Sequence, residues 1–242
     1  MTSNPMTKSR VYENIALDSE PMTVSGAVNK TLILLLITAV TSCFTWNVAA
    51  SGMLDKAQIL IWTGLILGFI LAIVTSFKPD KSPVLAPVYA ICEGLAVGGI
   101  SYMYNTAFYP GIVLQAVVGT FLALFTMLVL YKTGLIKATN TFRKVVITST
   151  FAIAIYYIVG LIASLLGHPM TSFGTPFGIG VSVVICAIAS LNFILDFDFI
   201  ENGANSLAPK YFEWYGGFAL LVTTIWLYFE ILRLLAQLSS RR

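Results

Sequence analysis

Long runs of apolar residues recur along most of the chain, and short polar segments separate them. A helix needs about 20 mostly apolar residues to cross the hydrocarbon layer of a bilayer. Seven runs meet this length, and they lack the polar–apolar alternation of barrel strands. The predicted spans are Thr31–Ala50, Ala57–Phe77, Pro83–Tyr104, Pro110–Tyr131, Val145–Leu166, Phe177–Ile200 and Gly216–Leu238. Because backbone groups in lipid must be satisfied within the segment, we expect an all-α, seven-helix integral membrane protein.

The first 30 residues break this pattern, because they are polar, mixed in charge and contain Pro5 and Pro21. They are too long and too acidic for a signal peptide, and the run that follows is long enough to remain as a span. We therefore predict a mobile cytoplasmic tail over residues 1–30 and a single transmembrane domain over residues 31–242.

Basic residues alternate between the two sides of the predicted bundle. The tail and the loops after spans two, four and six hold ten of them: Lys8, Arg10, Lys30, Lys78, Lys81, Lys132, Lys137, Arg143, Lys144 and Lys210. The loops between spans on the other side hold only Lys56. Since positive loops stay in the cytoplasm, the N-terminus is predicted to be cytoplasmic and the C-terminus outside. Arg241 and Arg242 oppose that last placement, so a re-entrant final segment remains the alternative.

The composition agrees with a lipid environment and excludes several classes of function. Of the 242 residues, 57% are hydrophobic and 10% are charged, against about a quarter charged in soluble domains. The net charge of +3 is too diffuse to track a nucleic acid backbone. Cys43, Cys92 and Cys186 lie in apolar runs and are expected to be buried, and the lone His168 cannot build a metal site. With no P-loop and no nucleophile–histidine set, we expect neither an enzyme nor a bound cofactor.

Four carboxylates lie in or at the ends of the predicted spans: Glu93, Asp196, Asp198 and Glu230. An acid at the centre of a spanning helix costs about 2.5–3.5 kcal/mol, so such residues usually face the bundle interior and mark an ion path. Glu93 has no basic neighbour in the sequence and is a secondary candidate for a cavity residue.

The geometry of the helix separates the two aspartates. Two residues turn a helix by about 200°, so Asp196 and Asp198 point to nearly opposite faces. Asp198 shares its face with Glu201, which suits a solvated helix end, and this leaves Asp196 for the bundle interior.

Glu230 allows two interpretations, because Arg233 lies three residues later on the same helix face. Either the two form a neutral ion pair, or Glu230 is an interior acid available for protonation or cation contact. If Asp196 and Glu230 meet, they would share a proton and titrate as a unit, and Ca²⁺ would be the natural guest for their oxygens. They meet only if span six continues beyond Ile200 or span seven is displaced.

Three segments resemble signatures of the transmembrane Bax inhibitor motif family, in its prokaryotic branch. They are Glu93–Gly98 followed by Tyr104, Ser190–Asp196 followed by Ile200, and Leu227–Glu230. The resemblance implies a last helix surrounded by the other six, and a pH-sensitive calcium leak in the bacterial inner membrane. It also implies that Asp196 and Glu230 are the proton sensor and contact calcium. Glu230 stands where the family usually has Asp, Phe197 and Asp198 where Thr-Gln is usual, and Arg233 where Asn is common.

Two classes of function follow. The first is a passive, proton-gated cation leak, with calcium ions and protons as its partners and no nucleic acid. The alternative is a regulatory protein that does not transport ions and modulates a membrane protease or a cell-death or stress pathway through a membrane protein partner. A proton-coupled transporter is a further option, although the sequence shows no internal repeat of the kind common in transporters.

Overall fold

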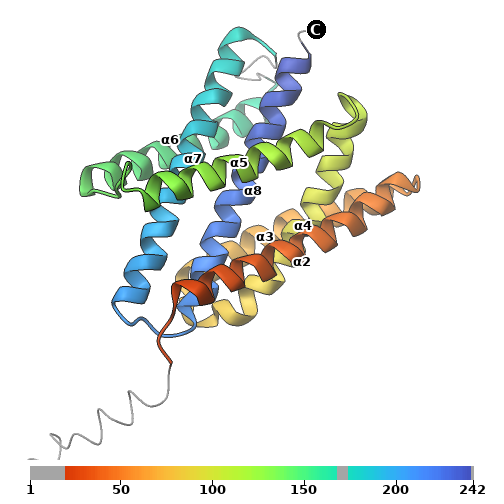
Figure 1. The fold of residues 1–242 in the computed structure, drawn as a ribbon. Helices are drawn as coiled ribbons and strands as arrows, with labels where there is room; N and C mark the ends of the chain where they lie inside the picture. Colours follow the sequence, from red (N-terminus) through yellow and green to blue (C-terminus); the bar gives the residue numbers. More distant parts are fainter. Residues whose placement is uncertain (1–19, 168–173, 241–242) are drawn as a thin grey trace, which may run out of the picture.

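The computed structural model describes residues 20–167 and 174–240, and within them the long elements are seven α-helices. They are α2 (Val24–Ala50), α3 (Leu54–Phe77), α4 (Ser82–Ala107), α5 (Ile112–Lys132), α6 (Asn140–Leu165), α7 (Pro176–Asn205) and α8 (Phe212–Ser239), with a 3₁₀ turn, η2 (Pro79–Lys81), before α4. Figure 1 shows their order. Most of the predicted tail, together with His168, Arg241 and Arg242, lies outside the described residues.

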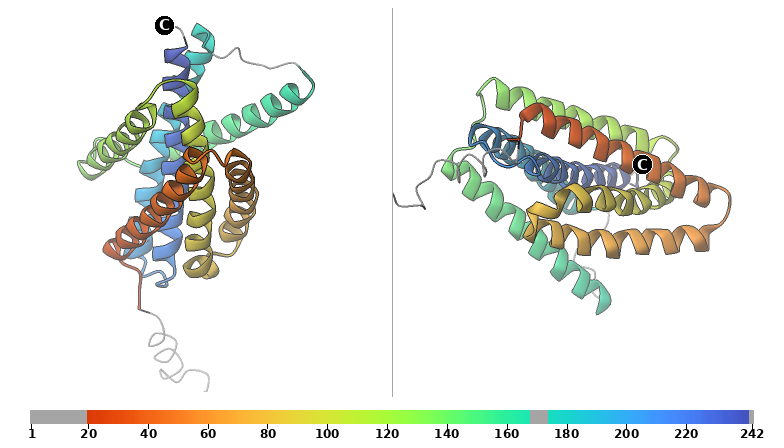
Figure 2. Two further views of the ribbon diagram at one scale, coloured as in Figure 1. Left: turned by 90° about the vertical axis from the view of Figure 1, so that its right-hand side faces the viewer. Right: turned by 90° about the horizontal axis from the view of Figure 1, so that it is seen from below.

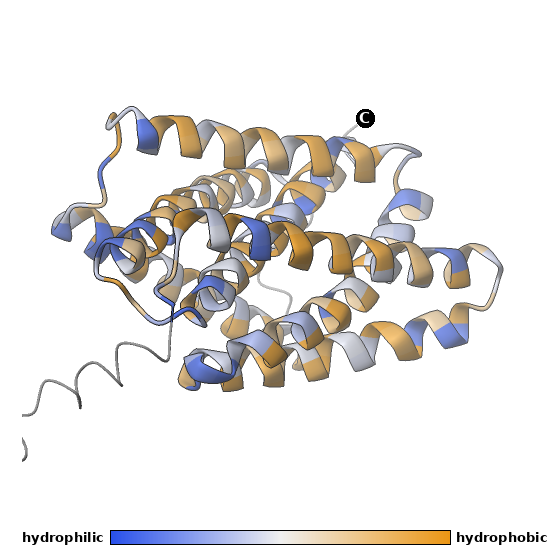
Figure 3. Ribbon diagram, turned by 60° about the horizontal axis from the view of Figure 1, so that its bottom comes forward, coloured by the Kyte–Doolittle hydropathy of each residue, from blue (hydrophilic) through white to orange (hydrophobic). Residues whose placement is uncertain are grey.

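All seven helices are long and apolar enough to cross a membrane, which confirms the predicted all-α, seven-span architecture. Figure 3 shows hydrophobic residues along the helices and hydrophilic residues gathered toward their ends and connections. Large apolar side chains point outward, as on Phe69 of α3 and Phe151 of α6, both 68% exposed. Such surface requires lipid around it rather than water.

The start of α2 differs from the prediction. The helix begins at Val24 rather than Thr31, so residues 24–30 belong to the helix and not to the tail. Polar residues in this first part lower the local hydropathy, but Thr23 caps the helix by accepting a hydrogen bond from Gly26 N at 2.9 Å. Just before it, Met22 N donates to Ala208 O at 2.8 Å, which ties the entry of α2 to the α7–α8 connection.

The last two helices are both longer than predicted. Helix α7 continues past Ile200 to Asn205, and α8 is one unbroken helix of 28 residues. At 1.5 Å per residue, α8 is about 42 Å long, enough to cross a bilayer completely. A re-entrant segment turns back within the membrane, and Phe212–Ser239 contains no such turn. The start of α2 and the end of α8 lie at opposite faces of the bundle (Figure 1).

Helix α8 occupies the centre, as expected for a last helix enclosed by the others (Figure 2). It is the most buried of the seven, and Leu221, Leu227 and Leu232 are fully buried. Helices α2, α4, α5 and α7 pack along it, whereas α3 packs mainly on α4 and α2. Helix α6 reaches α8 through the side chain of Tyr157.

Small residues let α2 and α4 approach closely. A Cβ added at Gly94 would overlap Thr41 of α2, and one added at Gly98 would overlap the carbonyl of Ser42. The glycines of α4 thus serve helix packing, as is typical of membrane helices.

Candidate functional site

Asp196 lies on α7, more than two turns before the helix ends, and faces α8. Its Oδ2 accepts a hydrogen bond from Thr223 Oγ1 of α8 at 2.6 Å. One turn earlier on α7, Asn192 Nδ2 donates to Thr150 Oγ1 of α6 at 3.0 Å. Two polar residues of one sequence motif therefore connect α7 to both α8 and α6.

Glu230 is buried in the interior of α8, with only 5% of its surface exposed. Its Oε1 accepts a hydrogen bond from the hydroxyl of Tyr157 on α6. Its Oε2 is buried and has no hydrogen-bond partner among the residues that the structure describes. An unsatisfied buried carboxylate oxygen is costly, so it marks a place for a proton, a water molecule or a cation.

Arg233 reaches the same tyrosine rather than Glu230 itself. Its Nη1 donates to Tyr157 Oη at 3.2 Å, and its guanidinium carbon lies 5.6 Å from the centre of that ring. Among residues 20–167 and 174–240 the ion pairs are Arg143–Asp198 and Lys210–Glu20, so Glu230 and Arg233 form no direct pair. Tyr157 therefore bridges them, and the sequence reasoning did not identify it.

Asp196 contacts α8 at Thr223, and Glu230 lies further along the same helix. The two acids do not form a single hydrogen-bonded pair. Thr223, which holds Asp196, and Glu230 are seven residues apart, which is about two turns and about 10 Å along the helix axis. Each carboxylate has its own partner, so the condition for a directly shared proton is not met in this structure. The arrangement is instead two acids in succession on one side of the central helix.

Asp198 and Glu201 point away from α8, as the helix geometry predicts. Arg143 Nη2 lies 2.5 Å from Asp198 Oδ2, and Tyr131 donates a hydrogen bond to Glu201. The Asp198 side chain is 18% exposed, so it is an ion-paired residue that ties α6 to α7 and not a freely solvated helix end.

Glu93 lies apart from these acids. It faces α3, where a Cβ added at Gly68 would come within 3.0 Å of its Oε1. In the described part of the chain, no three His, Cys, Asp or Glu side chains converge as a metal site. Any cation contact at Asp196 or Glu230 would therefore need water or backbone oxygens as further ligands.

A further buried acid, Glu213, was not singled out from the sequence. It is 4% exposed, and its Oε1 accepts hydrogen bonds from Thr23 N and Thr23 Oγ1, each at 3.0 Å. A negative charge is favourable at the N-terminus of α2, where Thr23 lies. Nearby, the hydrogen bond and charge of Lys210 hold the pKa of Glu20 below its usual range. The signals were an acid in the first turn of α8 and a threonine cap on α2, but nothing in the sequence paired them.

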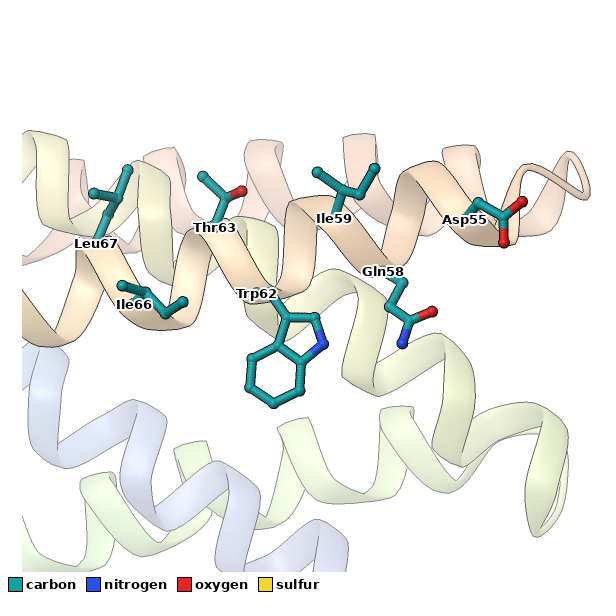
Figure 4. Close-up of a pocket in the computed structure, with 7 residues that line it drawn as sticks. All are labelled: Asp55, Gln58, Ile59, Trp62, Thr63, Ile66 and Leu67. Atoms are coloured by element: carbon teal, nitrogen blue, oxygen red, sulfur yellow. The ribbon is translucent and has the colours of Figure 1, made fainter.

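A shallow groove on the outside of α3 does not contribute to this site. Figure 4 shows that its labelled residues, including Trp62 and Ile66, all project from α3. Asp55 at one end is its only carboxylate, and none of the interior acids lines it.

The motif residues now have structural roles. Leu227 is fully buried, Tyr228 Oη and Ser101 Oγ on α4 lie 2.6 Å apart in a hydrogen bond, and Glu230 contacts α6. The family model described as Bax inhibitor 1 like matches residues 3–240. The chain belongs to the Bax inhibitor 1 like family. A search of curated proteins found no match. Family membership and the seven apolar helices together make this a multi-pass integral membrane protein in contact with the lipid bilayer.

Proposed function

We propose that this member of the Bax inhibitor 1 like family is a passive, proton-gated cation leak with Ca²⁺ as the permeant ion. The observation that carries the proposal is the Glu230 carboxylate, which is buried in the central helix with one oxygen lacking a hydrogen-bond partner in the described residues. Asp196 supplies a second acid about two turns away on the same side of α8.

The gating follows from the cost of charge in a membrane. A protonated carboxyl is neutral and is tolerated in the apolar bundle, whereas an ionised carboxylate there must be compensated. Loss of the protons from Asp196 and Glu230 would create negative charge along α8, and a cation entering from water would neutralise it. Carboxylate oxygens suit Ca²⁺ in particular. The leak should therefore increase as the pH rises.

The proposal also covers the orientation of the protein in the membrane and the mode of transport. We infer that the N-terminus faces the cytoplasm of a bacterial cell, because basic residues concentrate on that side of the bundle. The transport is passive and the protein is not an enzyme, since the sequence carries neither a nucleotide-binding motif nor a catalytic set.

The test is a flux measurement on purified protein in liposomes that contain a calcium-sensitive dye, over a range of about pH 5 to pH 8. Wild-type flux should rise with pH, and Asp196→Asn and Glu230→Gln should each flatten that dependence. Asp55→Asn, an exposed acid at the start of α3, is the matched control and should behave as wild type.

Unchanged flux and an unchanged pH profile in both interior variants would show that these acids do not gate the protein. A wild-type protein that passes no ion, but that co-purifies with a stoichiometric membrane partner, would support the regulatory class instead.

A further inference from the structure

A large cavity opens between α2 and α5, away from the Tyr157–Glu230 contact. Its volume is about 850 Å³, and its inner wall is formed by residues of α7 and by Leu220 of α8. Figure 2 (right) shows α2 and α5 running side by side along this part of the bundle. The apolar lining comes mostly from these two helices: Val24, Val28, Leu32, Phe121, Leu124 and Leu128.

One end of the cavity is basic. Lys132 at the end of α5 and Lys137 in the segment that follows both line it, and both are exposed. Neither lysine is in an ion pair in the described part of the chain. The two acids of the lining are already engaged, Asp198 by Arg143 and Glu201 by Tyr131. Among the residues that the structure describes, the two lysines thus have no acidic partner.

The charged and apolar parts of the cavity follow one another along α2 and α5. Val24 begins α2 and Lys132 ends α5, so both lie at the same face of the bundle. From there the lining continues inward, to Leu35 on α2 and Phe121 on α5, each about three turns from that end of its helix. This layout matches a phospholipid, whose charged headgroup stays at the interface while its chains enter the hydrocarbon.

We propose that this cavity binds an anionic phospholipid from the leaflet at the face where α2 begins. Lys132 and Lys137 hold the phosphate, and an acyl chain lies between α2 and α5. Basic pockets between membrane helices are suited to anionic headgroups, because each lysine attracts the negative charge of the lipid. A zwitterionic headgroup has no net charge, so the same lysines attract it less strongly. The proposal is independent of ion conduction.

The test is lipid binding to the full-length protein in detergent, measured by native mass spectrometry with palmitoyl-oleoyl phosphatidylglycerol or the matching phosphatidylcholine. Phosphatidylglycerol should be retained preferentially. The double variant Lys132→Gln/Lys137→Gln should bind it about 30-fold more weakly, from the usual contribution of two lysines at an anionic surface. Lys78→Gln/Lys81→Gln is the matched control, because it removes the same charge from another loop on the same face and should leave binding unchanged.

A second pair of variants tests the apolar part while keeping every lysine. Val28→Trp should fill the cavity and reduce phosphatidylglycerol binding several-fold, whereas Val40→Trp, on the outward face of the same helix, should not. Three outcomes would each overturn the proposal: equal binding of the two lipids, an equal loss in both lysine double variants, or full binding by Val28→Trp.

Discussion

Tyr157 is the side chain on which the geometry around Glu230 depends, because its hydroxyl donates to the carboxylate and accepts from Arg233. Tyr157→Phe would remove the hydrogen bond to Glu230 Oε1, while Oε2 already has no hydrogen-bond partner among the described residues. We expect the free energy of unfolding to fall by about 1–3 kcal/mol, the usual cost of stranding a buried polar group. Denaturation in mixed detergent, followed by circular dichroism, measures this change.

The neighbouring tyrosine provides a control for that substitution. The hydroxyl of Tyr156 is buried without a hydrogen-bond partner in the described residues, so Tyr156→Phe should cost little or even stabilise the protein. If the two variants lost equal stability, Tyr157 would have no special role at Glu230.

The two tyrosines also show why this contact could not be predicted from the sequence. Both lie in one apolar run, about 100° apart around α6, and the residues on either side give no strong polar face. The hydropathy pattern therefore identified the acid on α8 but not its partner. By contrast, the facing of Asp196 and Asp198 followed from the turn of a helix alone, and the contacts with Thr223 and Arg143 agree with it.

Side-chain hydrogen bonds stabilise the first turn of α2. Thr23 Oγ1 accepts from Gly26 N at 2.9 Å and donates to Glu213 Oε1 at 3.0 Å. Thr23→Ala should therefore lower the free energy of unfolding by about 1–2 kcal/mol, as expected for a lost helix cap, while Thr23→Ser should restore most of it. Amide hydrogen exchange over Val24–Lys30 should rise in the alanine variant.

Thr106→Ala is the comparison for that experiment. Thr106 is exposed near the end of α4 and donates only to carbonyls of its own helix. Its loss should change the free energy of unfolding by less than about 0.5 kcal/mol. A Thr23→Ala protein as stable as this control would mean that the cap does not hold α2.

The helix interiors were predictable because hydropathy reports which residues tolerate lipid, and every predicted span falls on an observed helix. The positions of the helix ends were less predictable. Helix α2 starts seven residues before the prediction and α7 ends five residues after it, because caps and interhelical hydrogen bonds extend helices beyond the hydrocarbon. The extension of α7 places Asp196 well inside its helix, a position that the hydropathy pattern alone did not show.

The arrangement of the bundle explains why the two acids are not adjacent. Asp196 is fixed against the first half of α8, and Glu230 lies two turns further toward the other face. The depth of a residue in the bundle depends on how far its helix is shifted along its neighbours. The pattern of apolar residues does not specify that shift. A sequence resemblance could therefore select both acids without giving the distance between them.

The side on which each loop lies gives a last prediction. Ser51 follows α2 and Ser206 follows α7, both are exposed, and five helices separate them, so they must lie on opposite sides of the membrane. Under the proposed orientation, with the basic loops in the cytoplasm, Ser206 is cytoplasmic. With Cys43, Cys92 and Cys186 replaced by alanine, the Ser51→Cys variant should react with a membrane-impermeant maleimide in bacterial spheroplasts. The Ser206→Cys variant should react only after permeabilisation. The reverse result would invert the orientation, and reaction of both in intact spheroplasts would contradict a bundle in which each helix spans the bilayer.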